Sequence, residues 1–328
     1  MDRFVMCTRD VQGSAFIAEP GPTRYLMVPE GVLPAPSHEV AKADVWMKRL
    51  RKASVWGKDT RVPERARGDI LIFIHGYNND QATVMQRHDR IATDLATAGF
   101  KGVVLSFDWP SEAMAINYME DRHDAKLTAM QLVSDGIKLL AQEQTPDCAI
   151  NIHLLAHSTG AYVVREAFDD ADDARLANNS WNVSQIAFIG GDISSGSLSA
   201  GNATTESLYR HCARLTNYSN LYDSVLKLSN AKRLGVAPRV GRGGLPPDAP
   251  RQGVNVDCSA YFDSLCNDPA VLAADQVEKI GSFDHSWHIG NRVFARDLFE
   301  VLRGDLDRSV IPTRRANADG ALELVRTT

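Results

Sequence analysis

The sequence predicts an α/β fold in which helices cover both faces of a mainly parallel sheet. Two observations lead to this prediction. Short runs that are apolar throughout alternate along the chain with longer segments whose apolar residues recur at helical spacing. Polar residues follow the ends of several of these runs, at the edge where parallel sheets place their binding and catalytic groups. We therefore expect one α/β domain with a working site at the carboxyl ends of its strands.

The composition limits the classes of protein to which the chain can belong. With 328 residues, 44% of them hydrophobic, it can bury a large core without a disulfide or metal. The net charge of −5 comes from interspersed acidic and basic residues, so we expect no nucleic-acid partner. No apolar run reaches membrane-spanning length and no leader pattern precedes the first strand, which predicts a cytoplasmic protein without an integral membrane segment. The oligomeric state stays open.

The strands and helices can be placed from these patterns. Apolar runs at 69–74, 102–107, 152–155 and 184–189 are typical of strands buried on both sides, and we expect the last strand at 254–257. Helical periodicity predicts helices over 81–98 and 124–142. We divide the single domain, 1–328, into an N-terminal extension (1–68) with short strands, a catalytic core (69–302) and a polar tail (303–328) with a mobile end.

One serine lies where a strand turns into a helix. Ala156, His157, Ser158, Thr159 and Gly160 separate the apolar run that ends at Leu155 from a segment of helical character. Such a turn exposes the serine hydroxyl and needs small neighbours, because other backbone segments pass close to it. This pattern is the nucleophile elbow, with Ala156 where glycine is usual. An ordinary strand-to-helix loop is the alternative, and the flanking strand and helix favour the elbow.

A serine needs a base, and the base needs a carboxylate that holds it in the right tautomer. Downstream of Ser158 we favour His285 as the base because it lies in a loop after the last strand, and His288 is the alternative. Asp223 and Asp192 both follow strands and qualify as the acid. We favour Asp223, although an aspartate that opens a helix is also a common N-cap.

The remaining site residues surround this triad. The oxyanion donors that we expect are the backbone N–H groups of Thr159 and of Tyr77 or Asn78. The side chains that we assign to a substrate pocket are His75, Trp109, His157, Asp192 and Trp287. Trp109 can equally belong to the core. No metal-binding spacing is present, and we expect neither a metal nor another cofactor.

Five blocks of the chain resemble a bacterial α/β-hydrolase family of unassigned function. They are the residues at 73–78, 106–111, 154–160, 222–223 and 285–287. The blocks at 75–78 and 109–111 are fairly specific, whereas many esterases and lipases share the elbow. The resemblance spans about 69–302. It implies the α/β-hydrolase fold and serine-hydrolase chemistry, without naming a substrate.

From the residues and the resemblance together we expect a serine hydrolase of the carboxylesterase or lipase type. Ser158, His285 and Asp223 form its triad, and a small acyl compound is its substrate. Two alternatives stay open. An acyltransferase would pass the same acyl group to an acceptor other than water, and a noncatalytic module would bind a ligand or protein on the same scaffold.

Overall fold

The computed structural model describes residues 2–59, 62–111, 126–138, 140, 148–169, 181–231 and 238–327. Its strands are β1 (Arg3–Gln12), β2 (Ala15–Val28), β3 (Val55–Lys58), β4 (Ala66–Ile74), β5 (Val103–Asp108), β6 (Cys148–His157), β7 (Val183–Ile189), β8 (Cys212–Ser219), β9 (Gly253–Asp257), β10 (Arg314–Ala316) and β11 (Leu322–Leu324). Its α-helices are α1 (Ala43–Ser54), α2 (Gln81–Ala98), α5 (Thr159–Asp169), α6 (Ala203–Arg210), α7 (Ser224–Ala231), α8 (Val240–Gly243), α9 (Ser259–Asn267), α10 (Pro269–Asp275), α11 (Phe283–Ser286) and α12 (Arg292–Arg303).

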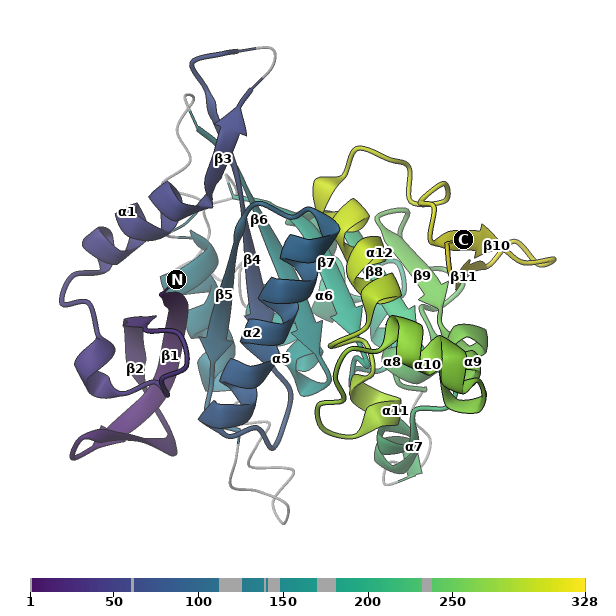
Figure 1. Cartoon of the computed structure of the whole chain (residues 1–328), viewed down its shortest axis with the longest axis horizontal. Helices are drawn as coiled ribbons and strands as arrows, with labels where there is room; N and C mark the ends of the chain where they lie inside the picture. Colours follow the sequence, from purple (N-terminus) through teal and green to yellow (C-terminus); the bar gives the residue numbers. More distant parts are fainter. Residues whose placement is uncertain are drawn as a thin grey trace.

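The strands form one mainly parallel sheet, as predicted (Figure 1). Within the described residues the order across it is β10-β11-β9-β8-β7-β6-β4-β5-β1-β2, and β3 pairs with β4. The pairs from β1 through β5, β4, β6, β7 and β8 to β9 are all parallel. Strand β6, which leads to Ser158, therefore lies in the middle of the sheet.

Successive side chains of a strand point to opposite faces, and both faces of this sheet are covered. Ile72 belongs to a core with Trp46 of α1 and Val163 of α5, whereas its neighbour Phe73 belongs to a second core with Leu95 of α2 and Leu298 of α12. Figure 1 shows α2 and α12 side by side on one face. This double burial explains why the central strands are apolar throughout.

Helix α2 has the predicted bounds because both of its ends carry strong signals. The Asp80 side chain accepts a hydrogen bond from the Thr83 N–H at 2.7 Å and caps the first turn. Gly99, with a φ of 113°, ends the helix in the left-handed conformation. The helix predicted over 124–142 is described only at 126–138 and 140, where it contains a π-helical turn (Leu132–Ile137). Its other residues lie outside the described ranges.

Both ends of the chain extend the sheet. Strand β1 pairs in parallel with β5, and β2 pairs with β1, so the N-terminal extension forms one edge of the sheet. The expectation that 254–257 is the last strand was wrong, because β11 pairs with β9 and β10 pairs with β11. A fully buried ion pair between Arg314 and Asp297 of α12, at 2.6 Å, fixes this hairpin. Strands of three residues in a polar tail are too short for a periodicity argument.

Candidate active site

Ser158 lies on a sharp turn between β6 and α5. Its φ is 56°, in the left-handed region that costs a residue with a Cβ about 1–2 kcal/mol. Three backbone hydrogen bonds hold it there. The Ser158 N–H donates to Ile189 O, and Ser158 O accepts from the N–H groups of Ala161 and Asp192, at 3.0–3.1 Å. The strain falls on the one residue whose side chain the elbow presents, and the neighbouring strand β7 holds it in place.

Two glycines leave room for this turn. A Cβ at Gly76 would lie 2.7 Å from the Ser158 Cβ, and a Cβ at Gly160 would lie 2.4 Å from Ile74 O. Neither position therefore accepts a side chain without moving backbone. This crowding gives a physical reason for glycine both in the His75-Gly76 turn and in the elbow.

His285 and Asp223 are paired beside the elbow. The two side chains are buried, and His285 Nδ1 lies 2.7 Å from Asp223 Oδ2. An ionised carboxylate only accepts, so the pair holds a proton on Nδ1 and leaves Nε2 as the acceptor. The other oxygen, Asp223 Oδ1, accepts the Leu226 N–H at 2.8 Å. Asp223 thus caps α7 and contacts the histidine at the same time. Its role as an N-cap therefore does not exclude a role as the carboxylate that supports the base.

The His285 ring lies against the segment that holds Ser158. A Cβ at Gly190 would lie 3.0 Å from His285 Cε1, and Gly190 directly follows Ile189, which binds the Ser158 N–H. The ring centre of His285 is also 4.8 Å from that of His157. Residues from β6, β7 and α11, distant in sequence, therefore meet around the serine.

The two alternative residues have other partners. Asp192 forms an ion pair with Arg239 at 3.0 Å and accepts the Ser229 hydroxyl at 3.0 Å. His288 is buried, its ring stacks on Trp287 with centres 4.1 Å apart, and neither ring nitrogen has a hydrogen-bond partner among the described residues. Burial, and then the charge of His285, hold the pKa of His288 well below its usual value. Because Asp192 is bound by Arg239 and Ser229 and His288 stacks on Trp287, the structure favours Asp223 as the acid and His285 as the base.

The loop after β4 is fixed by its own hydrogen bonds. The Asn78 N–H donates to Ser111 O at 2.7 Å, and the Asn79 amide donates to Gly76 O and Tyr77 O at 2.7 and 2.9 Å. The Asn78 N–H is thus already donated, which counts against Asn78 as an oxyanion donor. Thr159 supplies the first N–H of α5, at the positive end of the helix dipole.

Two tryptophans assigned to the substrate pocket have no exposed surface. Trp109 stacks on His75, and its indole N–H donates to His75 O at 2.9 Å. Trp287 packs between His288 and the aromatic rings of Tyr261 and Phe262. Neither side chain reaches an open surface, which favours a core position for both, the alternative already open for Trp109. Each is bulky and apolar, and the core takes it up.

Asp108, at the end of β5, is the centre of a buried network of polar contacts below the loop after β4. It is fully buried and contacts Arg9 Nε at 2.8 Å, the Gln81 amide at 2.9 Å and His75 Nε2 at 3.5 Å. Burial alone would raise the pKa of Asp108, but the charge of Arg9 and the His75 contact bring it well below its usual value. The backbone N–H of Trp109 also lies 3.2 Å from His75 Nε2. His75 thus belongs to a structural network under the loop rather than to an open pocket.

Sequence reasoning did not single out Arg87. This side chain of α2 is buried, and its Nη1 lies 3.1 Å from His157 Nδ1, directly before Ser158. The signal was present in the sequence. Arg87 lies three residues after Val84 and four before Ile91, so helical periodicity places it on the buried face.

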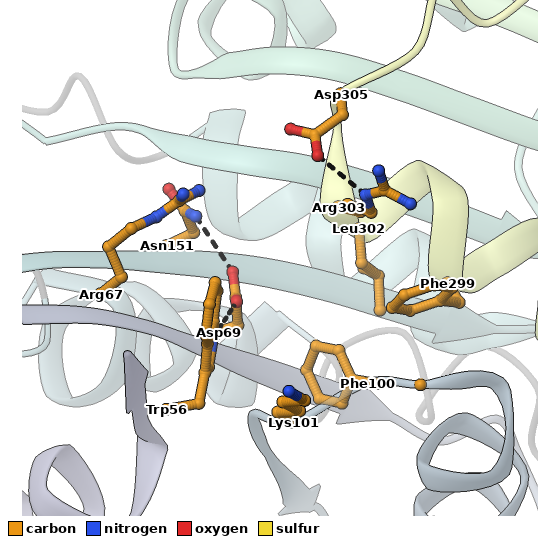
Figure 2. Close-up of a pocket in the computed structure, with 11 residues that line it drawn as sticks. Trp56, Arg67, Asp69, Phe100, Lys101, Asn151, Phe299, Leu302, Arg303 and Asp305 are labelled. Carbon is orange, nitrogen blue, oxygen red and sulfur yellow. Dashed lines mark hydrogen bonds and ion pairs between the residues drawn. The ribbon is translucent and has the colours of Figure 1, made fainter. Parts of the chain in front are cut away.

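An open pocket lies at the amino ends of the central strands, where β4 and β6 begin (Figure 2). It has a volume of about 180 Å³ and is lined by residues of β3, β4, β6 and α12 and of the turn after α2, among them Trp56, Asp69, Phe100 and Phe299. Asp69 accepts hydrogen bonds there from Trp56 and Asn151, at 2.6 and 3.0 Å. The parallel strands run from these amino ends toward the elbow at their carboxyl ends, so the pocket is remote from Ser158.

A family model matches residues 55–250, which include the elbow and Asp223. The family is described as α/β-hydrolase of unknown function (DUF900). The chain belongs to this family. The matched part runs from β3 to just beyond α8, so the α/β-hydrolase fold predicted from the sequence is confirmed.

The solved structures to which the chain is similar are distant from it in sequence. A dienelactone hydrolase from Anabaena variabilis is 16% identical, with 81% of this chain and 93% of that chain covered and a TM-score of 0.34. Esterase B from Lactobacillus rhamnosis, inhibited by a tributyrin phosphonate, is 12% identical, with coverages of 72% and 76% and a TM-score of 0.37. Phospholipase PlaB from Legionella pneumophila is 12% identical, with coverages of 72% and 62% and a TM-score of 0.33. No curated protein matches the chain.

Of the helices in the described ranges, none combines the length and the apolar character that a membrane span needs.

Proposed function

We propose that this α/β-hydrolase family member is a serine hydrolase that cleaves carboxylic esters. Ser158 is the nucleophile, His285 the general base and acid, and Asp223 the carboxylate that orients the base. The observation that supports this most strongly is the meeting of two independent features. A serine with a left-handed backbone directly follows His157, whose ring centre is 4.8 Å from that of His285, and His285 Nδ1 is 2.7 Å from a carboxylate.

The reaction proceeds in two half-reactions. Ser158 Oγ attacks the carbonyl carbon while His285 Nε2 takes its proton, and Asp223 stabilises the imidazolium that forms. The N–H groups of Thr159 and of Tyr77 or Asn78 stabilise the oxyanion. The C–O bond to the alcohol then breaks, and His285 returns the proton to the leaving oxygen. Water, deprotonated by His285, attacks the acyl-enzyme and releases the acid and free Ser158.

Asp223 is well suited to this role because its two oxygens have separate tasks. Oδ2 faces the histidine and Oδ1 holds the first turn of α7, so the cap fixes the carboxylate in orientation. Asp192, the alternative, is already the partner of Arg239 and Ser229. The proposal therefore assigns the acid to Asp223.

Covalent labelling with a fluorophosphonate, together with hydrolysis of p-nitrophenyl butyrate, tests this proposal. We expect one adduct per chain and esterase activity in the natural protein, and neither in Ser158→Ala. Ser195→Ala is the matched control, since both serines are 8% exposed and Ser195 Oγ donates only to Gly244 O among the described residues. Label in Ser158→Ala, or no label in the natural protein, would contradict the proposal. The second result would favour the noncatalytic alternative.

A further inference from the structure

Arg87 is a buried cation of helix α2. Its side chain is 5% exposed, and among the described residues no Asp or Glu oxygen lies within ion-pair distance of it. Burial lowers its pKa to about 10, which leaves it charged at neutral pH. An unpaired buried charge is costly, so a role for it has to be sought in the contacts it makes.

Those contacts determine the tautomer of His157. A guanidinium only donates hydrogen bonds, so His157 Nδ1, at 3.1 Å from Arg87 Nη1, must be the acceptor. The ring proton therefore sits on Nε2. Burial, and then the charge of Arg87, hold the pKa of His157 well below its usual value, so the ring stays neutral.

The proton on Nε2 points toward the residue proposed as the base. His157 Nε2 lies 3.3 Å from the backbone oxygen of His285 and 3.4 Å from Ser286 Oγ. Arg87 Nη2 reaches the same Ser286 Oγ at 3.5 Å. Helix α11 is thus held at its backbone by His157, while Asp223 holds the His285 ring at Nδ1.

We propose that Arg87 and His157 are positioning residues that hold His285 at a fixed place beside Ser158. His157 is suited to this because it is covalently joined to Ser158 and hydrogen-bonded to His285, so one imidazole links the nucleophile to the base. The inference rests on the proposed function, since it concerns the distance between those two groups. A misplacement of about 1 Å in such a site is enough to slow the reaction about 100-fold.

Arg87→Met tests this inference, because it keeps the length of the side chain and removes the donor and the charge. We expect kcat for p-nitrophenyl butyrate, and the rate of fluorophosphonate labelling, to fall about 10- to 100-fold, with KM changed less than about threefold. The Tm should stay the same or rise, because a buried unpaired charge is replaced by an apolar side chain. Arg87→Lys should recover part of the loss. Arg90→Met, on the same helix and paired with Asp94, is the control that should leave kcat unchanged.

The possible outcomes separate this inference from the proposed function. If the natural protein takes the label and Arg87→Met takes it equally fast, the positioning role is wrong and the serine hydrolase stands. A lower Tm with unchanged kcat would likewise overturn it and leave Arg87 a structural residue. If the natural protein takes no label, both proposals fall. Should Arg87→Met not fold, ¹⁵N NMR of the natural protein decides, because the inference requires His157 to be neutral with its proton on Nε2, and a proton on Nδ1 would overturn it.

Discussion

Two of the histidine–aspartate pairs in the described part of the chain lie at opposite ends of the strands of the sheet. At the carboxyl end, His285 Nδ1 is 2.7 Å from Asp223, and at the amino end, His153 Nε2 is 3.0 Å from Asp69. Both histidines are buried. The difference lies in their surroundings. The His285 ring lies against the segment that holds a serine with a left-handed backbone. Asp69 instead also accepts from Trp56 and Asn151, at the wall of an open pocket. A histidine–aspartate contact becomes a candidate catalytic pair only through what stands next to it.

The same comparison shows that the open cavity and the candidate catalytic residues lie at different ends of the strands. The pocket of Figure 2 is an evident cavity, but it lies at the amino ends of the strands, whereas sites in open α/β sheets lie beyond the carboxyl ends. The elbow, by contrast, is built from groups that are nearly all buried.

Removing the two histidines should give the largest contrast. We expect His285→Ala to lower kcat/KM for p-nitrophenyl butyrate about 10⁴- to 10⁶-fold, because the serine loses its base. His153→Ala should lower the free energy of unfolding by about 1–3 kcal/mol, since Asp69 loses a buried hydrogen bond, and change kcat little. Steady-state kinetics and urea unfolding of both variants check this. Comparable losses of kcat in the two would refute the distinction between the pairs.

The two carboxylates should differ in the same direction. Asp223→Asn keeps the size of the side chain but no longer holds His285 in the required tautomer, so we expect kcat to fall about 10³- to 10⁴-fold. Asp69→Asn should leave kcat nearly unchanged. Assays of both variants, with Asp192→Asn beside them, decide which acid supports the base. A larger loss in Asp192→Asn than in Asp223→Asn would transfer the role to Asp192.

Glycine positions offer a smaller contrast. Gly76→Ala would put a Cβ 2.7 Å from the Ser158 Cβ, so the elbow must shift, and we expect kcat to fall about 10- to 100-fold with about 1–3 kcal/mol lost in unfolding free energy. At Gly57 in β3, near the other end, a Cβ would meet nothing within 4 Å, so Gly57→Ala should be neutral. Kinetics and thermal unfolding measure both. Full activity in Gly76→Ala would show that the elbow tolerates displacement.

A buried imidazole that contacts a hydroxyl, with no carboxylate partner among the described residues, should affect stability and not catalysis. His88 of α2 contacts the Ser106 hydroxyl at 2.8 Å instead of a carboxylate, and burial, followed by the charge of Arg3, lowers its pKa to about 4. In the unfolded chain the His88 imidazole takes up a proton near pH 6.5, whereas in the folded protein it does so only near pH 4. The contribution of the neutral imidazole to the free energy of unfolding is therefore fully present above pH 6.5 and falls by about 3 kcal/mol as the pH drops toward 4. In urea unfolding between pH 7 and pH 5, His88→Asn should lose about 2 kcal/mol less than the natural protein. Equal losses in both proteins would contradict the role of His88.

Much of the fold could be predicted because its signals are local. The apolar strands, the capped helix α2 and the serine between strand and helix each depend on a few adjacent residues. The assignments of Ser158, His285 and Asp223 remain predictions until they are tested. The sequence left Trp109 open between core and pocket and did not predict the buried position of Trp287, because an aromatic side chain at a strand or loop end looks the same in sequence whether it is buried or lines a pocket.

The rest depends on contacts between distant parts of the chain. Arg87 meets His157 across 70 residues, and Arg9 meets Asp108 across 99. Nothing near either arginine in the sequence reveals its partner, although periodicity places Arg87 on a buried face. The hairpin of β10 and β11 depends in the same way on Asp297, which binds Arg314.

Trapping the acyl-enzyme tests the central claim most directly. The natural protein is mixed with excess p-nitrophenyl butyrate and quenched in acid within the first turnovers, and the adduct is located by intact mass and peptide mapping. The proposed mechanism predicts one butyryl group on the peptide that contains Ser158, and none on that peptide in Ser158→Ala. Steady release of p-nitrophenol without any adduct on Ser158, or a butyryl group on another residue that forms at the rate of turnover, would contradict it.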